Sequence, residues 1–457
     1  MRQWAALPTL LGPLMLPCLA PPCHAQSFDD ALARAYLYNP QLGAERQRLR
    51  EIDEGVPRAL SGWRPRVIVD GSIGGSAIQD SIDVRHNPER RVPQHFNGTV
   101  TQPLYTGGRV PAQVGQAEAL VRAQRAQLLS TEAAVLLAAA GAYLDVARDQ
   151  RVVGLDRANV QVLERTLRAA EQSARAGEVT ETDAAQARAR LADGRATLAG
   201  AEAQLAASRA VFEQQVGTPP GALDLPRRRL AGLPSSRDNA VSRAVADNPD
   251  VAAARENQEA TRLGIDIARA GLYPTVSLQG RLSRLRETDV QLPHQSDNVA
   301  EATVQFSVPL YQGGETSAQT RQAKEASERT RLQRDQAQRQ ARQLAQSGWD
   351  VLAAAQERVR QQQASVAANE VAVRGITRQQ GVGARTLIEV LNAQQELFTA
   401  NVNLVSAEHD VTLGSLRLLS ATGRLTAEGL ALPAPLYDPV RHYRAVRDRW
   451  GGTTPSP

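Results

Sequence analysis

The chain has 457 residues and a formal net charge of +5, which comes from 53 basic and 48 acidic residues spread along the whole sequence. Aromatic residues make up only 4% of it. A surface that binds nucleic acid gathers its basic residues and places aromatic side chains between them, so this composition argues against nucleic-acid binding. We interpret the charges as the solvated faces of helices.

The N-terminus, residues 1–25, has the pattern of a secretory signal peptide. Arg2 provides a positive start, the segment 7–20 is apolar, and small residues lead to a cleavage site after Ala25. Cleavage there removes both cysteines, Cys18 and Cys23. A mature chain without thiols excludes disulfides, zinc–thiolate sites and cysteine nucleophiles. Each cysteine follows a proline, which argues against lipid attachment at either position.

The rest of the sequence is built twice. The dipeptide that begins at Asn39 recurs at Asn248, and the segment GWRPRVIVDG at Gly62 recurs as GLYPTVSLQG at Gly271, both 209 positions later. Two motifs that share one offset indicate an internal repeat. The predicted organisation is a signal peptide (1–25), a first repeat (26–230), a second repeat (231–429) and a C-terminal tail (430–457) that is extended or disordered.

Glycines mark the turns of each repeat. The segment TQPLYTGG ends at Gly108 and SVPLYQGG ends at Gly314, and residues 177–183 match residues 383–389, both 206 positions later. Glycine permits the positive φ that tight turns need, so we predict turns at these positions. The predicted turn glycines are Gly107, Gly108, Gly177, Gly313, Gly314 and Gly383.

Each glycine pair opens a long helical stretch. Residues 109–172 and 315–379 are rich in alanine, glutamine, arginine and leucine, and their apolar residues recur at helical spacing. Helices of ~60 residues, rising 1.5 Å per residue, are about 90 Å long, which exceeds an ordinary globular core. A second helix follows each turn, so each repeat forms a long antiparallel hairpin. The apolar faces are mostly alanine and bury little alone, so we predict that the hairpins assemble with neighbours into a bundle or tube.

Short strands are expected between the helices. After the signal peptide we find no apolar run of the ~20 residues that a spanning helix needs, so any membrane crossing must use strands. Apolar and polar residues alternate over 275–282 and 301–308, and less strictly over 66–74 and 96–102. This alternation is typical of outer-membrane barrels, and soluble sheets also show it. Four strands cannot close a barrel, whereas a homotrimer would supply ~12.

Aromatic residues flank the predicted strands where these meet the helices, and prolines stand beside them. An aromatic girdle anchors membrane proteins at the lipid–water interface, and packing at a crowded bend is the alternative interpretation. The candidate interface residues are Trp63, Tyr105, Tyr273 and Tyr311.

Taken together, these motifs resemble the TolC family of outer-membrane efflux and secretion channels. The most specific segment is VGARTLIEVLNA, residues 382–393, which looks like the family's periplasmic entrance motif. The resemblance implies three subunits that share a 12-stranded barrel and an α-helical tunnel in the outer membrane of a Gram-negative cell. It also implies two partners, a periplasmic adaptor and an inner-membrane ABC transporter or other pump, and an exported protein or small molecule.

The resemblance also assigns residues at the entrance. Arg385 would be the gate arginine and Asp183 its acidic partner, a pair that can be broken without covalent chemistry. Glu389 and Asn392 occupy the positions of an acidic ring at the constriction. Because Asn392 is neutral, we expect weaker cation attraction than the family pattern can give.

The predicted function is a passive conduit for type I secretion of a protein, such as an adenylate cyclase–haemolysin toxin. A drug-efflux channel is the first alternative and a periplasmic coiled-coil structural protein the second. We predict no enzyme, cofactor or metal site, because the six histidines are scattered without triad or metal-ligand spacing. No GxxxxGK loop is present, so the energy for export must come from a partner.

Overall fold

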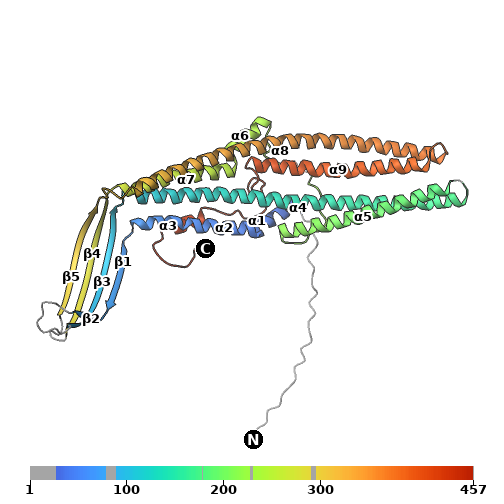
Figure 1. Ribbon diagram of the computed structural model, residues 1–457. Coiled ribbons are helices and arrows are strands. Elements are labelled where there is room, and N and C mark those ends of the chain that lie inside the picture. The colour runs from blue at the N-terminus through green and yellow to red at the C-terminus, as the bar shows by residue number, and fades with distance from the viewer. Residues whose placement is uncertain (1–26, 79–88, 178, 227–229, 290–294, 456–457) are drawn as a thin grey trace, which may run out of the picture.

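The computed structural model describes residues 27–455 except 79–88, 178, 227–229 and 290–294, so the predicted signal peptide lies outside the described residues. The molecule is elongated, with a sheet at one end and two helical hairpins that extend away from it (Figure 1). The turns of both hairpins lie together at the end opposite the sheet.

The sheet is antiparallel, with the strand order β1-β3-β4-β5. Its strands are β1 (Arg66–Ile73), β2 (Ser76–Ile78), β3 (Glu89–Tyr105), β4 (Thr275–Asp289) and β5 (Gln295–Ser307). The short β2 pairs with the far end of β3 and continues the line of β1. The strands β3, β4 and β5 are longer than the alternating segments predict, because polar residues extend the pairing beyond the apolar pattern.

The two faces of the sheet differ in polarity. Val276 pairs with Phe306 and Leu278 with Val304, so the apolar positions predicted on β4 and β5 share one face. On the other face, Arg281 pairs with Glu301. Both faces are solvent-exposed in a single chain. An apolar face of this kind requires lipid or another copy of the protein to cover it.

The two longest helices confirm the predicted stretches. α4 (Arg109–Arg175) and α8 (Glu315–Gly381) have 67 residues each. α4 forms a hairpin with α5 (Glu181–Val216), and α8 forms one with α9 (Leu387–Ala421). All six predicted turn glycines have positive φ, and a side chain at Gly107 would approach the Ala270 carbonyl to 2.8 Å.

Shorter helices precede each half of the sheet. In the first repeat they are α1 (Phe28–Tyr38), α2 (Pro40–Asp53), α3 (Gly55–Leu60) and the 3-10 turn η1 (Ser61–Trp63). In the second repeat they are α6 (Arg237–Asp247), α7 (Pro249–Arg269) and the 3-10 turn η2 (Ala270–Leu272). α4 lies between these elements, with α2 and α7 beside its sheet-side half and α5 and α9 beside the other half (Figure 1).

The repeated Asn-Pro dipeptides join two short helices end to end. Asn39 caps α2 through the Gln41 amide (2.9 Å) and donates its side-chain amide to the Gln215 carbonyl at the end of α5 (3.3 Å). Asn248 likewise caps α7 through the Asp250 amide (2.9 Å) and donates to the Ala421 carbonyl at the end of α9 (3.1 Å). Each asparagine therefore joins two short helices end to end, and the joined pair packs alongside a long helix.

The main core lies where α1, α4, α5, α9 and the C-terminal tail meet. Among the described residues, α4 is the one helix apolar enough by length and composition to cross a membrane, contrary to the sequence expectation. However, 61% of its most apolar window is buried inside the protein, as expected for a core helix rich in alanine.

The C-terminal tail differs from the prediction that it is extended or disordered. Leu430 and Leu432 join the main core, and a short helix, α10 (Arg441–Val446), packs on α2. The His442 ring lies 3.0 Å from the Asp53 carboxylate, and both groups are buried. Burial raises the pKa of Asp53, although His442 and Arg125 oppose the shift. The apolar anchors are isolated among prolines, so they give no periodic pattern in the sequence.

Candidate functional site

The end of the molecule farthest from the sheet carries the predicted entrance residues. Here the α4–α5 turn at Gly177 and the α8–α9 turn at Gly383 lie close together (Figure 1). A small apolar cluster ties α4, α5 and α9 together next to these turns, and it consists of Val160, Leu163, Leu191 and Leu391. The charged residues of the turns are thus held at the end of a packed three-helix unit.

The second helix of each hairpin, α5 or α9, begins with a capping box, and the two boxes lie at equivalent positions of the repeats. Thr180 accepts from the Asp183 amide (3.2 Å), and the Asp183 carboxylate accepts from the Thr180 amide (3.1 Å). The Thr386 amide donates to the Glu389 carboxylate in the same way (2.8 Å). Asp183 and Glu389 therefore satisfy the free backbone amides that begin α5 and α9. The sequence match between 177–183 and 383–389 reflects this structural role.

Arg385 pairs with Glu389 within the chain. The guanidinium donates to the Glu389 carboxylate (2.7 Å) and to the Gln379 side chain (3.2 Å). Hydrogen bonds from the Thr386 amide and from Arg385 lower the pKa of Glu389. The predicted partner of Arg385, Asp183, bonds Thr180 instead, so within one chain the structure does not bring the two together. A pairing between them would have to join neighbouring subunits.

Asn392 has a partner that the sequence analysis missed. Arg190 on α5 donates to the Asn392 side-chain oxygen (3.0 Å). Asn392 lies one turn beyond Glu389 on the same helix face, so Arg190 brings a positive charge to the predicted constriction. Arg190 is one of many arginines on α5, and only the helix packing reveals which of them faces α9.

The predicted interface aromatics all lie where the sheet meets the helices. Trp63 ends η1 and its carbonyl accepts from Gln102 of β3 (2.8 Å). Tyr105 ends β3, Tyr273 follows η2, and Tyr311 precedes α8 with 87% of its surface exposed. Tyr105, Tyr273 and Tyr311 are exposed, whereas Trp63 is half-buried. The interface role of the four residues stays a prediction.

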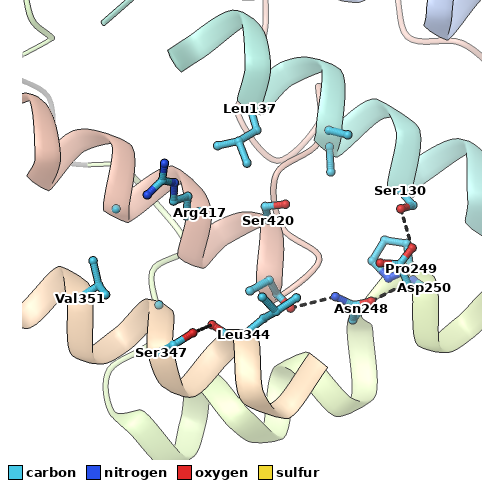
Figure 2. Close-up of a pocket in the computed structure, with 15 residues that line it drawn as sticks. Ser130, Leu137, Asn248, Pro249, Asp250, Leu344, Ser347, Val351, Arg417 and Ser420 are labelled. Atoms are coloured by element: carbon cyan, nitrogen blue, oxygen red, sulfur yellow. Dashed lines mark hydrogen bonds between the residues drawn. The ribbon is translucent and has the colours of Figure 1, made fainter. Parts of the chain in front are cut away.

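A cavity of about 500 Å³ lies where α4, α8 and α9 meet the start of α7. Figure 2 shows Arg417 and Asp250 at opposite sides of it. Asn248 also lines the cavity and donates its side-chain amide to the Ala421 carbonyl. Ser130 donates to Asp250 (2.5 Å), and most of the other lining is apolar. Among the described residues, no group of three or more His, Cys, Asp or Glu side chains is placed to hold a metal ion.

Comparisons with known proteins agree with this architecture. Residues 31–218 and 240–424 match the family described as Outer membrane efflux protein, one match for each repeat. The outer membrane efflux protein BepC of Brucella suis is 34% identical over 432 residues, which cover 94% of this chain and 92% of that protein. The alkaline protease secretion protein AprF of Pseudomonas aeruginosa is 27% identical over 191 residues, 42% of this chain and 40% of that protein.

Solved structures share the fold at low sequence identity. The CmeC outer membrane channel of Campylobacter jejuni matches with a TM-score of 0.78 at 14% identity, over 92% of this chain and 89% of that one. VceC of Vibrio cholerae matches with a TM-score of 0.75 at 20% identity, over 87% and 96%. The predicted fold class is thereby confirmed. The chain belongs to the outer membrane efflux protein family, and it is an outer-membrane channel of a tripartite export system, as the TolC resemblance predicts.

Proposed function

We propose that three copies of this chain form the outer-membrane conduit of a type I secretion machine and release a protein, such as a toxin, from the cell. The similarity to AprF, whose name states protease secretion, supports a protein cargo. The prolines before both cysteines argue against lipid anchoring and favour the same reading. An adaptor and an inner-membrane ABC transporter would recognise the cargo and supply the energy.

Efflux of small molecules is the second candidate. BepC is named an efflux protein, and its similarity extends over 94% of this chain. The channel body is compatible with either cargo, because the partners in the inner membrane select what enters. The two candidates therefore differ in phenotype rather than in the structure of the conduit.

The cargo is tested by deleting the gene and restoring it in the original bacterium. Secretion of repeat-containing protein substrates should be lost in the deletion strain and restored with the gene, while resistance to dyes and detergents changes little. Loss of resistance with normal protein secretion would contradict the proposal and favour efflux.

The observation that carries the conduit proposal is the set of charged groups at the hairpin turns. In a closed ring of three subunits, Arg385, Glu389 and Asp183 would recur around one aperture. A single exposed pair contributes little, but an aperture held by several such pairs can open stepwise without covalent chemistry. We propose that Arg385 holds this aperture, with Glu389 of its own chain and Asp183 of a neighbour as partners.

Planar-bilayer conductance tests the gate. Wild-type channels should conduct poorly, and Arg385→Ser should raise the conductance severalfold. Arg378→Ser is the matched control, because this exposed arginine in the last turn of α8 makes no ion pair among the described residues. Asp183→Ala should also open the channel, whereas Thr180→Ala, which weakens the same helix cap and keeps the carboxylate, should not. Equal conductance in wild type and Arg385→Ser would contradict the gate.

Ion selectivity tests the constriction. Glu389 supplies one carboxylate per subunit, and Arg190 places a positive charge beside Asn392. We therefore expect weak cation selectivity that disappears in Glu389→Gln and increases in Arg190→Gln. Unchanged reversal potentials in both variants would place the constriction elsewhere.

A further inference from the structure

The C-terminal tail runs along the first repeat toward the sheet. Tyr437 donates its amide to the Tyr36 hydroxyl at the end of α1 (2.9 Å), and His442 bonds Asp53 at the end of α2 (3.0 Å). Val446 is fully buried next to this pair in α10. Successive tail residues thus contact successive levels of the first repeat, and the direction of the tail is defined by three separate anchors.

The tail reaches the start of the first strand. Arg64 lies between η1 and β1, and its guanidinium donates to the Arg449 carbonyl (2.6 Å) and stacks on the Trp450 ring at 4.9 Å from the ring centre. Trp63, a candidate girdle residue, is the neighbour of Arg64 in the chain. Trp450 keeps 73% of its surface exposed. The tail therefore places Trp450, like Trp63, at the level where the sheet begins.

Further basic side chains lie on α3, β1 and α10, the elements next to Arg64 or Trp450 along the chain. Arg58 of α3, Arg66 of β1 and Arg444 of α10 are exposed, and none of them makes an ion pair among the described residues. Asp448 is the acidic residue of the same segment, and Arg447 lies 3.5 Å from it. We name Arg58, Arg64, Arg66, Arg444 and Trp450 the collar. The collar contains four arginines and no carboxylate, so it carries a net positive charge.

We propose that the collar binds the phosphate groups of phospholipids in the membrane leaflet nearest the helices. This inference rests on the proposed function, because it requires the sheet to lie in the outer membrane with its helix end at the interface. Tryptophan favours the headgroup level, since its ring is apolar and its indole N–H is polar. Arginine binds phosphate oxygens with two parallel hydrogen bonds and is attracted to anionic lipid surfaces. The tail would thereby fasten the chain to the membrane at a point outside the barrel.

Tryptophan fluorescence in brominated lipid tests the position of the collar. The mature chain, once the signal peptide with Trp4 is removed, has Trp63, Trp349 and Trp450. Three variants that each keep one tryptophan and carry phenylalanine at the other two positions are placed in phosphatidylcholine vesicles. Bromine on the upper acyl-chain carbons should quench Trp450 and Trp63 strongly and leave Trp349, on α8, at the level of unbrominated vesicles.

The outcomes separate the two proposals. Quenching of Trp63 without quenching of Trp450 overturns the collar and leaves the membrane position of the sheet intact. Absence of quenching at both positions overturns the collar together with that position. If a single-tryptophan variant fails to assemble, the loss of quenching between wild type and Trp450→Phe gives the same answer.

A second measurement tests the lipid chemistry. In the variant that keeps Trp450, brominated phosphatidylglycerol should quench about twofold more than brominated phosphatidylcholine, because it attracts the arginines. Arg66→Gln with Arg444→Gln should reduce that ratio to about one. Arg209→Gln, an exposed arginine on α5 far from the sheet, is the control and should keep the wild-type ratio. A ratio of one in the unaltered collar would exclude recognition of the anionic headgroup.

Discussion

The two repeats have the same layout and very different burial. α4 and α8 both have 67 residues, yet 25 residues of α4 are buried and only 6 of α8. α4 lies between α2 and α5 on one side and α7 and α9 on the other, whereas α8 lies at the edge of the helical layer and packs against α6, α7 and α9 (Figure 1). A duplicated sequence thus gives a duplicated backbone, but the surrounding elements decide how much each copy buries. The exposed side of α8 is available to a neighbouring copy in a closed tunnel.

The largest expected effect comes from the cores of the two repeats. Phe212 and Leu418 are equivalent positions, both fully buried, and Phe212 also packs against Tyr143 at 6.3 Å between ring centres. Phe212→Ala should cost about 3–5 kcal/mol of unfolding free energy, and Leu418→Ala about 2–4 kcal/mol because its cluster is smaller. Thermal unfolding followed by circular dichroism, at one protein concentration, measures both. A larger loss at Leu418 would reverse the comparison of the two cores.

The glycines that end α5 and α9 sharpen the same comparison. Gly217 and Gly423 both have positive φ, 82° and 69°. A Cβ at Gly423 would lie 2.3 Å from the Asp247 carbonyl oxygen, whereas a Cβ at Gly217 would meet no atom within 4 Å. Gly217→Ala should therefore cost about 1–2 kcal/mol for the left-handed backbone alone, and Gly423→Ala about 3 kcal/mol because a clash is added. Equal losses, measured in the same unfolding assay, would mean that the backbone at Gly423 relaxes.

Replacing the asparagines that join the short helices, Asn39 and Asn248, should have a smaller effect. Asn248 is more buried than Asn39, and it caps two amides, those of Asp250 and Val251. Asn248→Ala should cost about 2 kcal/mol and Asn39→Ala about 1 kcal/mol, since the first leaves the buried Ala421 carbonyl without its donor and the second leaves the partly buried Gln215 carbonyl. Asn248→Asp and Asn39→Asp keep the cap and lose the donor, so the difference between Asp and Ala isolates the cap.

The sequence predicts the architecture well, because the architecture depends on local signals. Glycine pairs and helical spacing locate the starts of α4 and α8 correctly, and alternation locates β1 and the helix-side parts of β3, β4 and β5. The sequence does not predict the far ends of β3, β4 and β5, because the pairing there continues through polar residues such as Arg284 and Asn298. Hydrogen bonding in a sheet does not require an apolar pattern.

The candidate site was predicted less completely, because its contacts join residues far apart in the sequence. The Asn-Pro repeat is visible in the sequence, but its role appears only when the end of α5 or α9 reaches it. Arg190 meets Asn392 across 202 positions. The capping role of Asp183 is local and could have been read from Thr180, three residues earlier.

A partly buried contact between the repeats gives the smallest predicted effect, and it depends on pH. His409 of α9 lies 3.1 Å from the Asp145 carboxylate of α4, and Arg148 lies 2.9 Å from it. Burial alone would raise the pKa of Asp145, but the His409 and Arg148 contacts outweigh it and lower the pKa below the ordinary value of 3.8. The carboxylate therefore stabilises the fold above that value, and this contribution is lost as the pH falls through the lowered pKa.

Asp145→Asn tests this contact between the repeats. Because the Asp145 side chain is 41% exposed, solvent screening limits the effect to about 1 kcal/mol or less. The variant should unfold at a lower temperature than wild type at neutral pH, and the difference should shrink in acid, where the wild-type carboxylate is protonated as well. Asp350→Asn is the control, because Asp350 pairs with Arg237 at an exposed edge, 3.3 Å away. A difference that persists unchanged in acid would mean that shape, and not charge, holds α4 against α9.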